Sequence, residues 1–165
     1  KASVRHVLEM TENLPVKVAL SLSDPFCVER HHQDFNELIR SRVDLLFCNQ
    51  EEAFTMMETQ VTQEALAGLS ENVETVVMTL GNRGSLICNQ GQIYYIDPIE
   101  VEVVDTTGAG DAYAAGFLYG FSHDQSIMNC GRIASVMAGT VIEQIGPRIE
   151  TASMKTLKER LSNIP

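Results

Sequence analysis

Residues 104–117 read VDTTGAGDAYAAGF, and this stretch decides how the fold is interpreted. An apolar strand ends at Asp105, small residues form a turn, and an alanine-rich helix follows. The free N–H groups at the start of a helix carry the positive end of its dipole and favour an anion. Gly108 and Gly110 let such an anion approach the backbone closely. The stretch therefore predicts an anion site, with Asp111 beside it in the first helical turn.

Two commoner glycine motifs do not fit these residues. A P-loop, GxxxxGK[ST], needs a lysine after its last glycine, and none follows Gly108 or Gly110. The dinucleotide fingerprint GxGxxG needs a small residue where Tyr113 stands. A Rossmann-type redox domain is therefore disfavoured. For Asp111 the alternative to a chemical role is a plain helix cap in a tight turn.

The segments on either side of this stretch alternate between helical and strand patterns. Apolar residues at helical spacing predict helices at 3–13, 28–42, 50–59, 62–70, about 109–121, 124–142 and 153–163. Nearly continuous apolar runs predict strands buried on both faces at 16–22, 43–49 and 73–80. A hairpin of SLICNQ and QIYYID around a Gly91-Gln92 turn follows, with a short strand at 101–104. This order predicts one compact α/β unit with helices on both faces of a mostly parallel sheet.

Composition and charge limit the classes of function. With 44% hydrophobic and 21% charged residues, the chain has ordinary globular usage, and no run approaches the ~18 apolar residues of a membrane span. A net charge of −10 without a basic cluster disfavours nucleic acid as a partner. We therefore expect a cytoplasmic protein with no membrane or nucleic-acid partner.

The cysteines and histidines show no metal-ligand spacing. The four cysteines lack a CxxC pair and predict reduced thiols, two of them in core strands: Cys27, Cys48, Cys88 and Cys130. The four histidines are predicted to lie on the surface: His6, His31, His32 and His123.

Residues 104–117 resemble the C-terminal signature of the ribokinase-like, or PfkB-type, carbohydrate and nucleoside kinases. Asn49-Gln50-Glu51-Glu52 matches the Asn-x-x-Glu motif of that family, and Thr79-Leu80-Gly81-Asn82-Arg83-Gly84 matches its TLGxxG nucleotide loop. SLSDPF at 21–26 and VDLLFCNQEEA at 43–53 are similar to adenosine kinases and related bacterial sugar kinases. The resemblance implies a three-layer α/β/α ribokinase-like fold.

The resemblance also implies an activity: ATP-dependent transfer of the γ-phosphate to a hydroxyl of a sugar or nucleoside. Asp111 would be the general base that takes the proton of the acceptor hydroxyl. The backbone N–H groups of Gly108, Ala109 and Gly110 would form the anion hole for the transferred group. The alternative is a regulatory domain that binds a nucleotide without performing the chemistry.

Two metal sites are implied by the same resemblance. Asn49 and Glu52 resemble the pair that organises Mg²⁺ through bound waters, although N-x-x-E is also the pattern of a capping box. Asp105 and Thr107 match positions that in many members line a loop for a monovalent cation such as K⁺, with Gly146 in the returning segment.

Several small residues are expected to border the nucleotide. Besides Asn49, these are Thr79, Gly81 and Gly84 in the loop, although GNRG is by itself also a plain turn. The segment 131–146 corresponds to the wall of the adenine pocket in relatives. Its small residues would let a flat base approach, and the same spacing is typical of helix packing: Ser135, Ala138 and Gly139.

The resemblance covers nearly the whole chain but only the C-terminal part of family members. Residues 1–165 are therefore expected to be the nucleotide-binding and catalytic part of a kinase. The N-terminal half, with the substrate lid, is expected to be absent from this stretch, which starts at Lys1 with a helical pattern. The acceptor, a small sugar or nucleoside, is left undefined. A sheet edge left uncovered could pair with a second chain, and a homodimer is one such arrangement.

Overall fold

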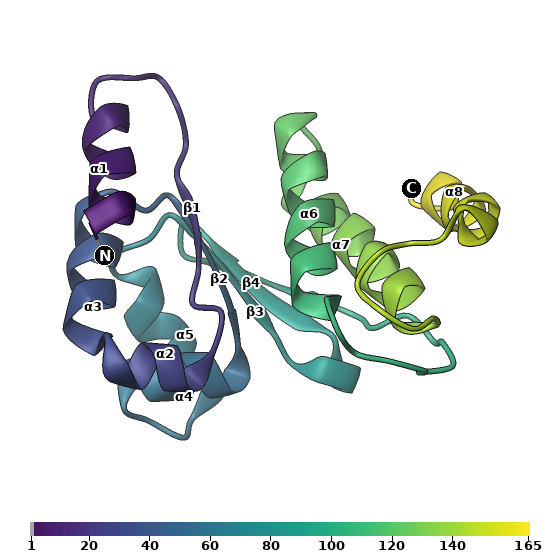
Figure 1. Ribbon diagram of the computed structural model, residues 1–165, viewed down its shortest axis with the longest axis horizontal. Coiled ribbons are helices and arrows are strands. Elements are labelled where there is room, and N and C mark those ends of the chain that lie inside the picture. The colour runs from purple at the N-terminus through teal and green to yellow at the C-terminus, as the bar shows by residue number, and fades with distance from the viewer. Residues whose placement is uncertain (1) are drawn as a thin grey trace. The chain divides into compact units, whose positions relative to one another are not determined.

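The computed structural model describes residues 2–165, and Figure 1 shows their course. The helices are α1 (Ala2–Thr11), α2 (Pro25–Arg30), α3 (His32–Ser41), α4 (Gln50–Met57), α5 (Thr62–Ser70), α6 (Ala109–Ser122), α7 (Ile127–Ile142) and α8 (Met154–Ser162). The strands are β1 (Ala19–Ser21), β2 (Leu45–Asn49), β3 (Thr75–Thr79), β4 (Ser85–Asn89) and β5 (Gln92–Ile96). Short 3₁₀ helices are η1 (Gly81–Arg83) and η2 (Thr151–Ser153). The predicted alternation of helix and strand is confirmed.

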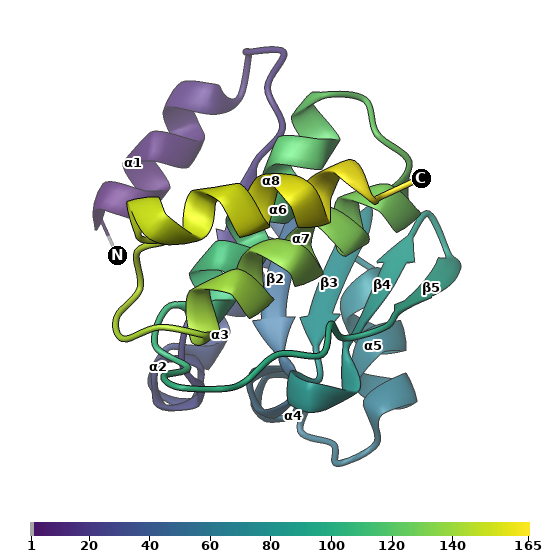
Figure 2. The ribbon, with the colours of Figure 1, turned by 90° about the vertical axis from the view of Figure 1, so that its right-hand side faces the viewer.

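In the described chain, the strands form one five-stranded sheet in the order β1-β2-β3-β4-β5. Figure 2 shows β2 to β5 in this order. β1 pairs with β2 in parallel, with Ala19 opposite Leu45. By contact density the chain divides into two compact units: Lys1–Met78 with Cys88–Ile93, and Thr79–Ile87 with Tyr94–Pro165.

The first unit has β2 and β3 at its core. The predicted continuous apolar runs are buried there, as expected for central strands: Leu45, Leu46, Phe47, Val76, Val77 and Met78. The helices α4 and α5 pack against each other and bury Met56, Leu66 and Leu69. Burial of these apolar side chains is the main term that stabilises this unit.

The prediction of a strand buried on both faces at 16–22 is wrong. Only Ala19–Ser21 form β1, where Ala19 and Ser21 are exposed, and Val16 is 43% exposed. β1 is at one edge of the sheet, so in residues 2–165 it has a hydrogen-bonded neighbour strand, β2, on one side only. Leu22 directly after it is fully buried, and its N–H donates to the Phe47 carbonyl at 3.0 Å. An apolar run alone does not distinguish an edge strand from a central one.

The single helix predicted at 28–42 is two helices, α2 and α3. His31 between them has φ −124° and ψ 26°, which interrupts the helical path. The α2 helix also begins earlier than predicted, because Asp24 caps it and Pro25 occupies its first turn. The Asp24 carboxylate accepts from the N–H groups of Phe26 at 2.8 Å and Cys27 at 3.1 Å.

The second unit contains the helical pair α6 and α7, which lie side by side in Figure 1. Glycines make this close approach feasible. A Cβ at Gly116 would stand 2.8 Å from the Ala134 Cα, and one at Gly120 would stand 3.0 Å from the Cys130 Cα. The glycines of α6 therefore serve helix packing. The start of α7 is also later than predicted, because Ser126 caps it through the N–H of Asn129 at 3.2 Å.

The strand predicted at 101–104 is not present. Val103 and Val104 are more than half exposed, and the N–H groups of Val104 and Asp105 both donate to the carbonyl of Ile142. This segment therefore caps the C-terminal end of α7 instead of joining the sheet. The hairpin is confirmed, but its turn is centred on Gln90 and Gly91, both with positive φ, one residue earlier than expected.

The described cysteines are free thiols, as predicted, and Cys48, Cys88 and Cys130 are buried. The prediction of four surface histidines is wrong for His32, which is half-buried with Nε2 2.8 Å from the Met56 carbonyl oxygen. No helix within residues 2–165 combines the length and apolar character needed to cross a membrane.

Candidate active site

The start of α6 forms where the sequence places it, and its two glycines differ. Gly108 has φ +80°, and a Cβ there would stand 2.5 Å from the Cβ of Pro147. Gly110 has nothing within 4 Å of the corresponding position. Gly108 is therefore required by the backbone turn and by Pro147, whereas Gly110 leaves open space at the helix start.

The N–H groups at this helix start are not equivalent. Ala109 donates to the Thr106 carbonyl at 3.1 Å, so this predicted member of the anion hole is already hydrogen-bonded. The first helical i→i−4 bond runs from Ala112 to Gly108 at 2.9 Å. The N–H groups of Gly110 and Asp111 precede the first i→i−4 bond of the helix. They therefore have no partner within the helix and are available to an anion.

Asp111 is exposed in the first turn of α6. Within residues 2–165 its carboxylate has neither a hydrogen bond nor an ion pair. A plain helix cap would bond to the backbone of its own turn, and Asp111 does not. The carboxylate is therefore accessible to accept a proton.

Asp105 holds the turn before α6 in place. One carboxylate oxygen accepts from the Thr107 N–H at 2.9 Å and the other from the Gly146 N–H at 2.9 Å. Hydrogen bonds from Thr107, and then from Gly146, lower the pKa of Asp105. The predicted residues Asp105, Thr107 and Gly146 are thus brought together, and Asp105 acts here as a clamp between two loops.

The predicted nucleotide loop follows β3 and closes on itself. The Leu80 N–H donates to the Gly84 carbonyl at 2.8 Å, and Thr79 is the last residue of β3. Gly81, with φ +62°, has open space around its Cβ position. A Cβ at Gly84, with φ +83°, would stand 2.0 Å from the Ile96 carbonyl oxygen, so this glycine fixes the loop against β5.

The small residues of α7 do not all face open space. Ser135 is 6% exposed, and its Oγ donates to the Asp97 carbonyl at 3.4 Å. A Cβ at Gly139 would stand 2.3 Å from the Cδ1 of Ile99. Ser135 and Gly139 therefore pack against the segment that follows β5, and Ala138 between them is half-buried. Helix packing accounts for Ser135 and Gly139, and a role of these residues in an adenine pocket stays a prediction.

Asn49 and Glu52 form a capping box at the start of α4. The Asn49 Oδ1 accepts from the Glu52 N–H at 2.8 Å, and the Glu52 Oε2 accepts from the Asn49 N–H at 2.9 Å. The Asn49 Nδ2 donates to the other Glu52 oxygen at 2.8 Å. Burial raises the pKa of Glu52, which the Asn49 N–H opposes, and the charges of Asp24 and Glu51 raise it further. Within the described residues no group of three acidic, histidine or cysteine side chains is arranged to hold a metal.

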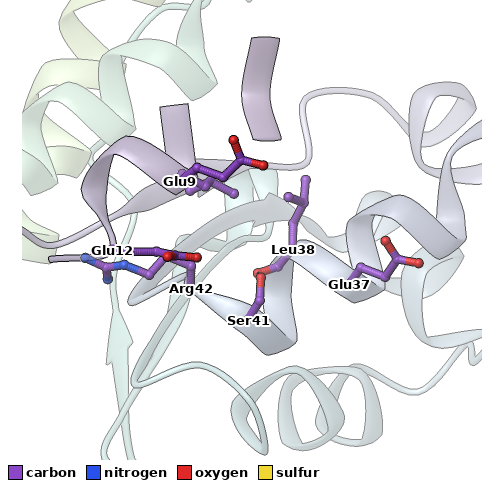
Figure 3. A pocket seen from close by; sticks show the side chains of 7 residues that line it. Glu9, Glu12, Glu37, Leu38, Ser41 and Arg42 are labelled. Atoms are coloured by element: carbon purple, nitrogen blue, oxygen red, sulfur yellow. The ribbon is translucent and has the colours of Figure 1, made fainter. Parts of the chain in front are cut away.

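A cavity of about 280 Å³ lies in the first unit, between α1 and α3 (Figure 3). Its lining includes Glu9 of α1, Glu12 just after that helix, Glu37 of α3, and Arg42 just after α3. None of the predicted site residues is among those that line it. Arg42 is held by the carbonyls of Thr11 and Val16 and by Asp44, so it serves the local fold.

Sequence reasoning missed the contacts that join these segments. Pro147 packs on Gly108, and Ser85 shares a hydrogen bond with Tyr113. These pairs are far apart in sequence, and nothing in their spacing links them. Tyr113 lies within residues 104–117, but nothing in that stretch indicates which residue its hydroxyl contacts.

The structure is an α/β fold in which α6 begins at a glycine turn with open space at Gly110. Residues 1–153 match the PfkB family of carbohydrate kinases, and the chain belongs to this family. The resemblance seen in the sequence is thereby confirmed.

Three relatives illustrate the likeness. The chain is 32% identical over 120 residues to an uncharacterized sugar kinase of Archaeoglobus fulgidus, covering 73% of this chain and 48% of that protein. It superposes with a TM-score of 0.90 on the crystal structure of a probable sugar kinase from Rhizobium etli, at 36% identity, covering 95% of this chain and 48% of that one. The crystal structure of adenosine kinase from Sinorhizobium meliloti also superposes with a TM-score of 0.90 at 36% identity. That match covers 95% of this chain and 49% of the kinase.

The predicted ribokinase-like α/β fold is confirmed by these structural matches. The chain spans about half the length of the relatives that it matches.

Proposed function

We propose that residues 1–165 carry the nucleotide-binding and catalytic part of an ATP-dependent kinase that phosphorylates a hydroxyl of a sugar or nucleoside. The observation that carries this is the exposed Asp111 carboxylate at a helix start whose Gly110 is open to an anion. Phosphoryl transfer needs mainly positioning and charge stabilisation, for which one well-placed base and a set of N–H donors suffice.

In this proposal Asp111 takes the proton of the acceptor hydroxyl. The hydroxyl oxygen bonds to the γ-phosphorus of ATP while the bond from that phosphorus to the bridging oxygen breaks, which releases ADP. The N–H groups of Gly110 and Asp111 stabilise the negative charge on the transferred group. The loop Thr79–Gly84 borders the nucleotide, with room at Gly81 and a fixed anchor at Gly84.

The capping box of Asn49 and Glu52 fits Mg²⁺ through bound waters. Each Glu52 oxygen accepts one hydrogen bond from Asn49, and a carboxylate oxygen has a second lone pair. Oxygen ligands are those that Mg²⁺ prefers, and the ion keeps much of its hydration. Bound there, Mg²⁺ would offset negative charge of the nucleotide phosphates.

The acceptor is proposed as a class, because the relatives include both an adenosine kinase and sugar kinases. The test is a coupled assay of ADP release by the complete protein with ATP and Mg²⁺. Adenosine, ribose and fructose are offered separately, and product is confirmed by mass. We expect acceptor-dependent ADP release with one of these. Nucleotide binding without transfer to any sugar or nucleoside would instead support the regulatory domain.

A further inference from the structure

A buried hydroxyl network joins three elements of the second unit. The Tyr113 Oη, on α6, shares a hydrogen bond with the Ser85 Oγ at 2.5 Å and lies 3.5 Å from the Gly131 carbonyl of α7. Tyr113 is 5% exposed and Ser85 is fully buried.

The two ends of this network belong to the segments that the proposed function uses. Ser85 directly follows Gly84, the last residue of the nucleotide loop, which the Ile96 carbonyl oxygen holds in place. Tyr113 stands two residues after Asp111 in the first turns of α6. The Ser85–Tyr113 hydrogen bond is therefore a direct link between the loop and the helix that carries the base.

Packing alone does not require these hydroxyls. Tyr113 and Phe117 are four residues apart on α6, are both buried, and so lie on one face of the helix. A phenylalanine would fill nearly the same space at 113, and alanine would fit at 85. Replacing both partners of a buried hydrogen bond by apolar groups is often nearly neutral for stability. A satisfied network instead fixes one relative position of the elements that it joins.

We propose that Tyr113 is a positioning residue that holds the nucleotide loop in register with the start of α6. The proposal rests on the kinase function proposed above. It adds a residue that touches neither substrate and acts through Ser85. Burial raises the pKa of Tyr113 to about 12, so its hydroxyl keeps its proton near neutral pH and the link persists there.

The test compares Tyr113→Phe with Tyr119→Phe in the complete protein. Tyr119 lies on the same helix and is 57% exposed, so it controls for the loss of a hydroxyl from α6. For Tyr113→Phe we expect KM for ATP and Kd for ADP to rise about fivefold to tenfold, the worth of one buried hydrogen bond. The KM for the acceptor should stay constant. Tyr119→Phe should match the parent.

Ser85→Ala removes the same hydrogen bond from its other end and provides a second variant should Tyr113→Phe fold poorly. It should raise the Kd for ADP by a similar factor, and the double variant should show little further increase. A merely structural hydroxyl would lower the melting temperature and the active fraction while KM for ATP and Kd for ADP stay at parent values. That result, or additive effects of the two substitutions, overturns the proposal.

The two proposals fail in different ways. A parent protein that binds ADP but transfers no phosphate overturns the kinase function, and the Kd comparison still decides the role of Tyr113. A parent that transfers phosphate, with variants of unchanged Kd and KM, overturns only the positioning role. A parent that binds neither ATP nor ADP overturns both.

Discussion

Asp111 and Glu52 each lie in the first turn of a helix, and they differ in exposure and in hydrogen bonding. Asp111 of α6 is exposed, whereas Glu52 of α4 is 5% exposed and bonds to Asn49 through both oxygens. Position in the first turn is favourable for either through the helix dipole. The difference is that both Glu52 oxygens bond to Asn49 in a capping box, whereas within residues 2–165 the Asp111 carboxylate forms no hydrogen bond or ion pair.

The comparison extends to the backbone that precedes each residue. Asn49 is the last residue of a buried strand, and its side chain closes the box. Before Asp111 the chain turns through Gly108, and Asp105 clamps that turn to Gly146 from one side. At α4 the acidic residue supports the helix start. At α6, Gly108 and the Asp105–Gly146 bond support the helix start, and Asp111 does not contribute to it.

Substitution of Asp111 by Asn should have the largest effect. The amide keeps the size of the side chain but cannot take the proton of an acceptor, and general-base catalysis contributes about 10²–10⁴-fold. We expect kcat to fall by about 10³-fold, with the Kd for ADP unchanged. Steady-state kinetics and isothermal titration measure the two quantities.

Asp124→Asn is the matched control for this variant. Asp124 is an exposed acid with φ +55°, a conformation that asparagine adopts readily, so the substitution should leave kcat at the parent value. If Asp111→Asn retained more than a few percent of the activity, the contrast between the two carboxylates would have no functional meaning.

Substitution of Gly108 by alanine should lower mainly stability, and substitution of Gly110 by alanine should lower mainly kcat. Gly108→Ala places a Cβ against Pro147 at a positive φ, which should destabilise the protein by about 1–3 kcal/mol. Gly110→Ala meets open space in a helix, so stability should be kept or rise by up to about 1 kcal/mol. Its methyl group would stand where the anion approaches, and we expect kcat to fall about tenfold.

Urea unfolding and steady-state kinetics on both variants check this pair. A Gly110→Ala variant with parent activity would contradict an anion site at the helix start. A Gly108→Ala variant with parent stability would show that Pro147 moves aside without penalty.

The sequence predicted most helices and the central strands β2 and β3, because their apolar patterns are long, but it merged α2 and α3 into one helix at 28–42. It also predicted where α6 begins, since glycine, a turn and an acidic first turn coincide at Gly108. It failed for β1 and for 101–104, where a short apolar run has the same pattern in an edge strand, a central strand or a loop. Whether such a run is buried depends on its neighbours in space, which the pattern does not contain.

For the candidate site, the sequence predicted residues but not their contacts. The Asn49–Glu52 spacing allowed a capping box, and the structure has it. The Asp105–Gly146 and Ser85–Tyr113 bonds join segments 41 and 28 residues apart. Such bonds follow from the packing of loops and helices, which single-sequence patterns do not specify.

Glu52→Gln tests the second member of the comparison. Glutamine at this position can still complete a capping box, so α4 should stay formed. Its amide lacks the charge that attracts a hydrated cation, and we expect the Mg²⁺ concentration for half-maximal activity to rise about threefold to tenfold. Glu51→Gln, in the same turn but exposed, is the control and should leave the Mg²⁺ dependence unchanged.

The stability of the parent protein should depend on pH through Glu52, and Glu52→Gln should remove that dependence. The pKa of Glu52 is raised in the folded state, so as pH rises the unfolded chain loses this proton first. The parent should therefore lose stability between the ordinary range of a glutamate and the raised pKa, and Glu52→Gln should lack that loss. Urea unfolding at a series of pH values measures it. Parallel curves for parent and variant would show that burial does not penalise the Glu52 charge.

Asp105→Asn should have the smallest effect, because asparagine keeps one of the two acceptor oxygens. It should retain the bond to Thr107 and lose the part-buried bond to Gly146, so we expect an activity loss of about twofold, within the worth of one hydrogen bond. If the two loops together hold a monovalent cation, activation by K⁺ should weaken as well. Glu102→Gln, exposed in the same segment, is the control.

The pH dependence of Asp105 runs opposite to that of Glu52. Its pKa is lowered, so its contribution to stability is complete above the ordinary range of an aspartate and is lost as pH falls through the lowered value. In Asp105→Asn this acid-side loss should be absent, which unfolding curves at low pH would record. Because the Asp105 carboxylate bonds to two loops of the second unit, such a change would also report whether the turn before Asp111 loosens on acidification. If Asp105→Asn lost as much stability at low pH as the parent, the loss would come from other carboxylates.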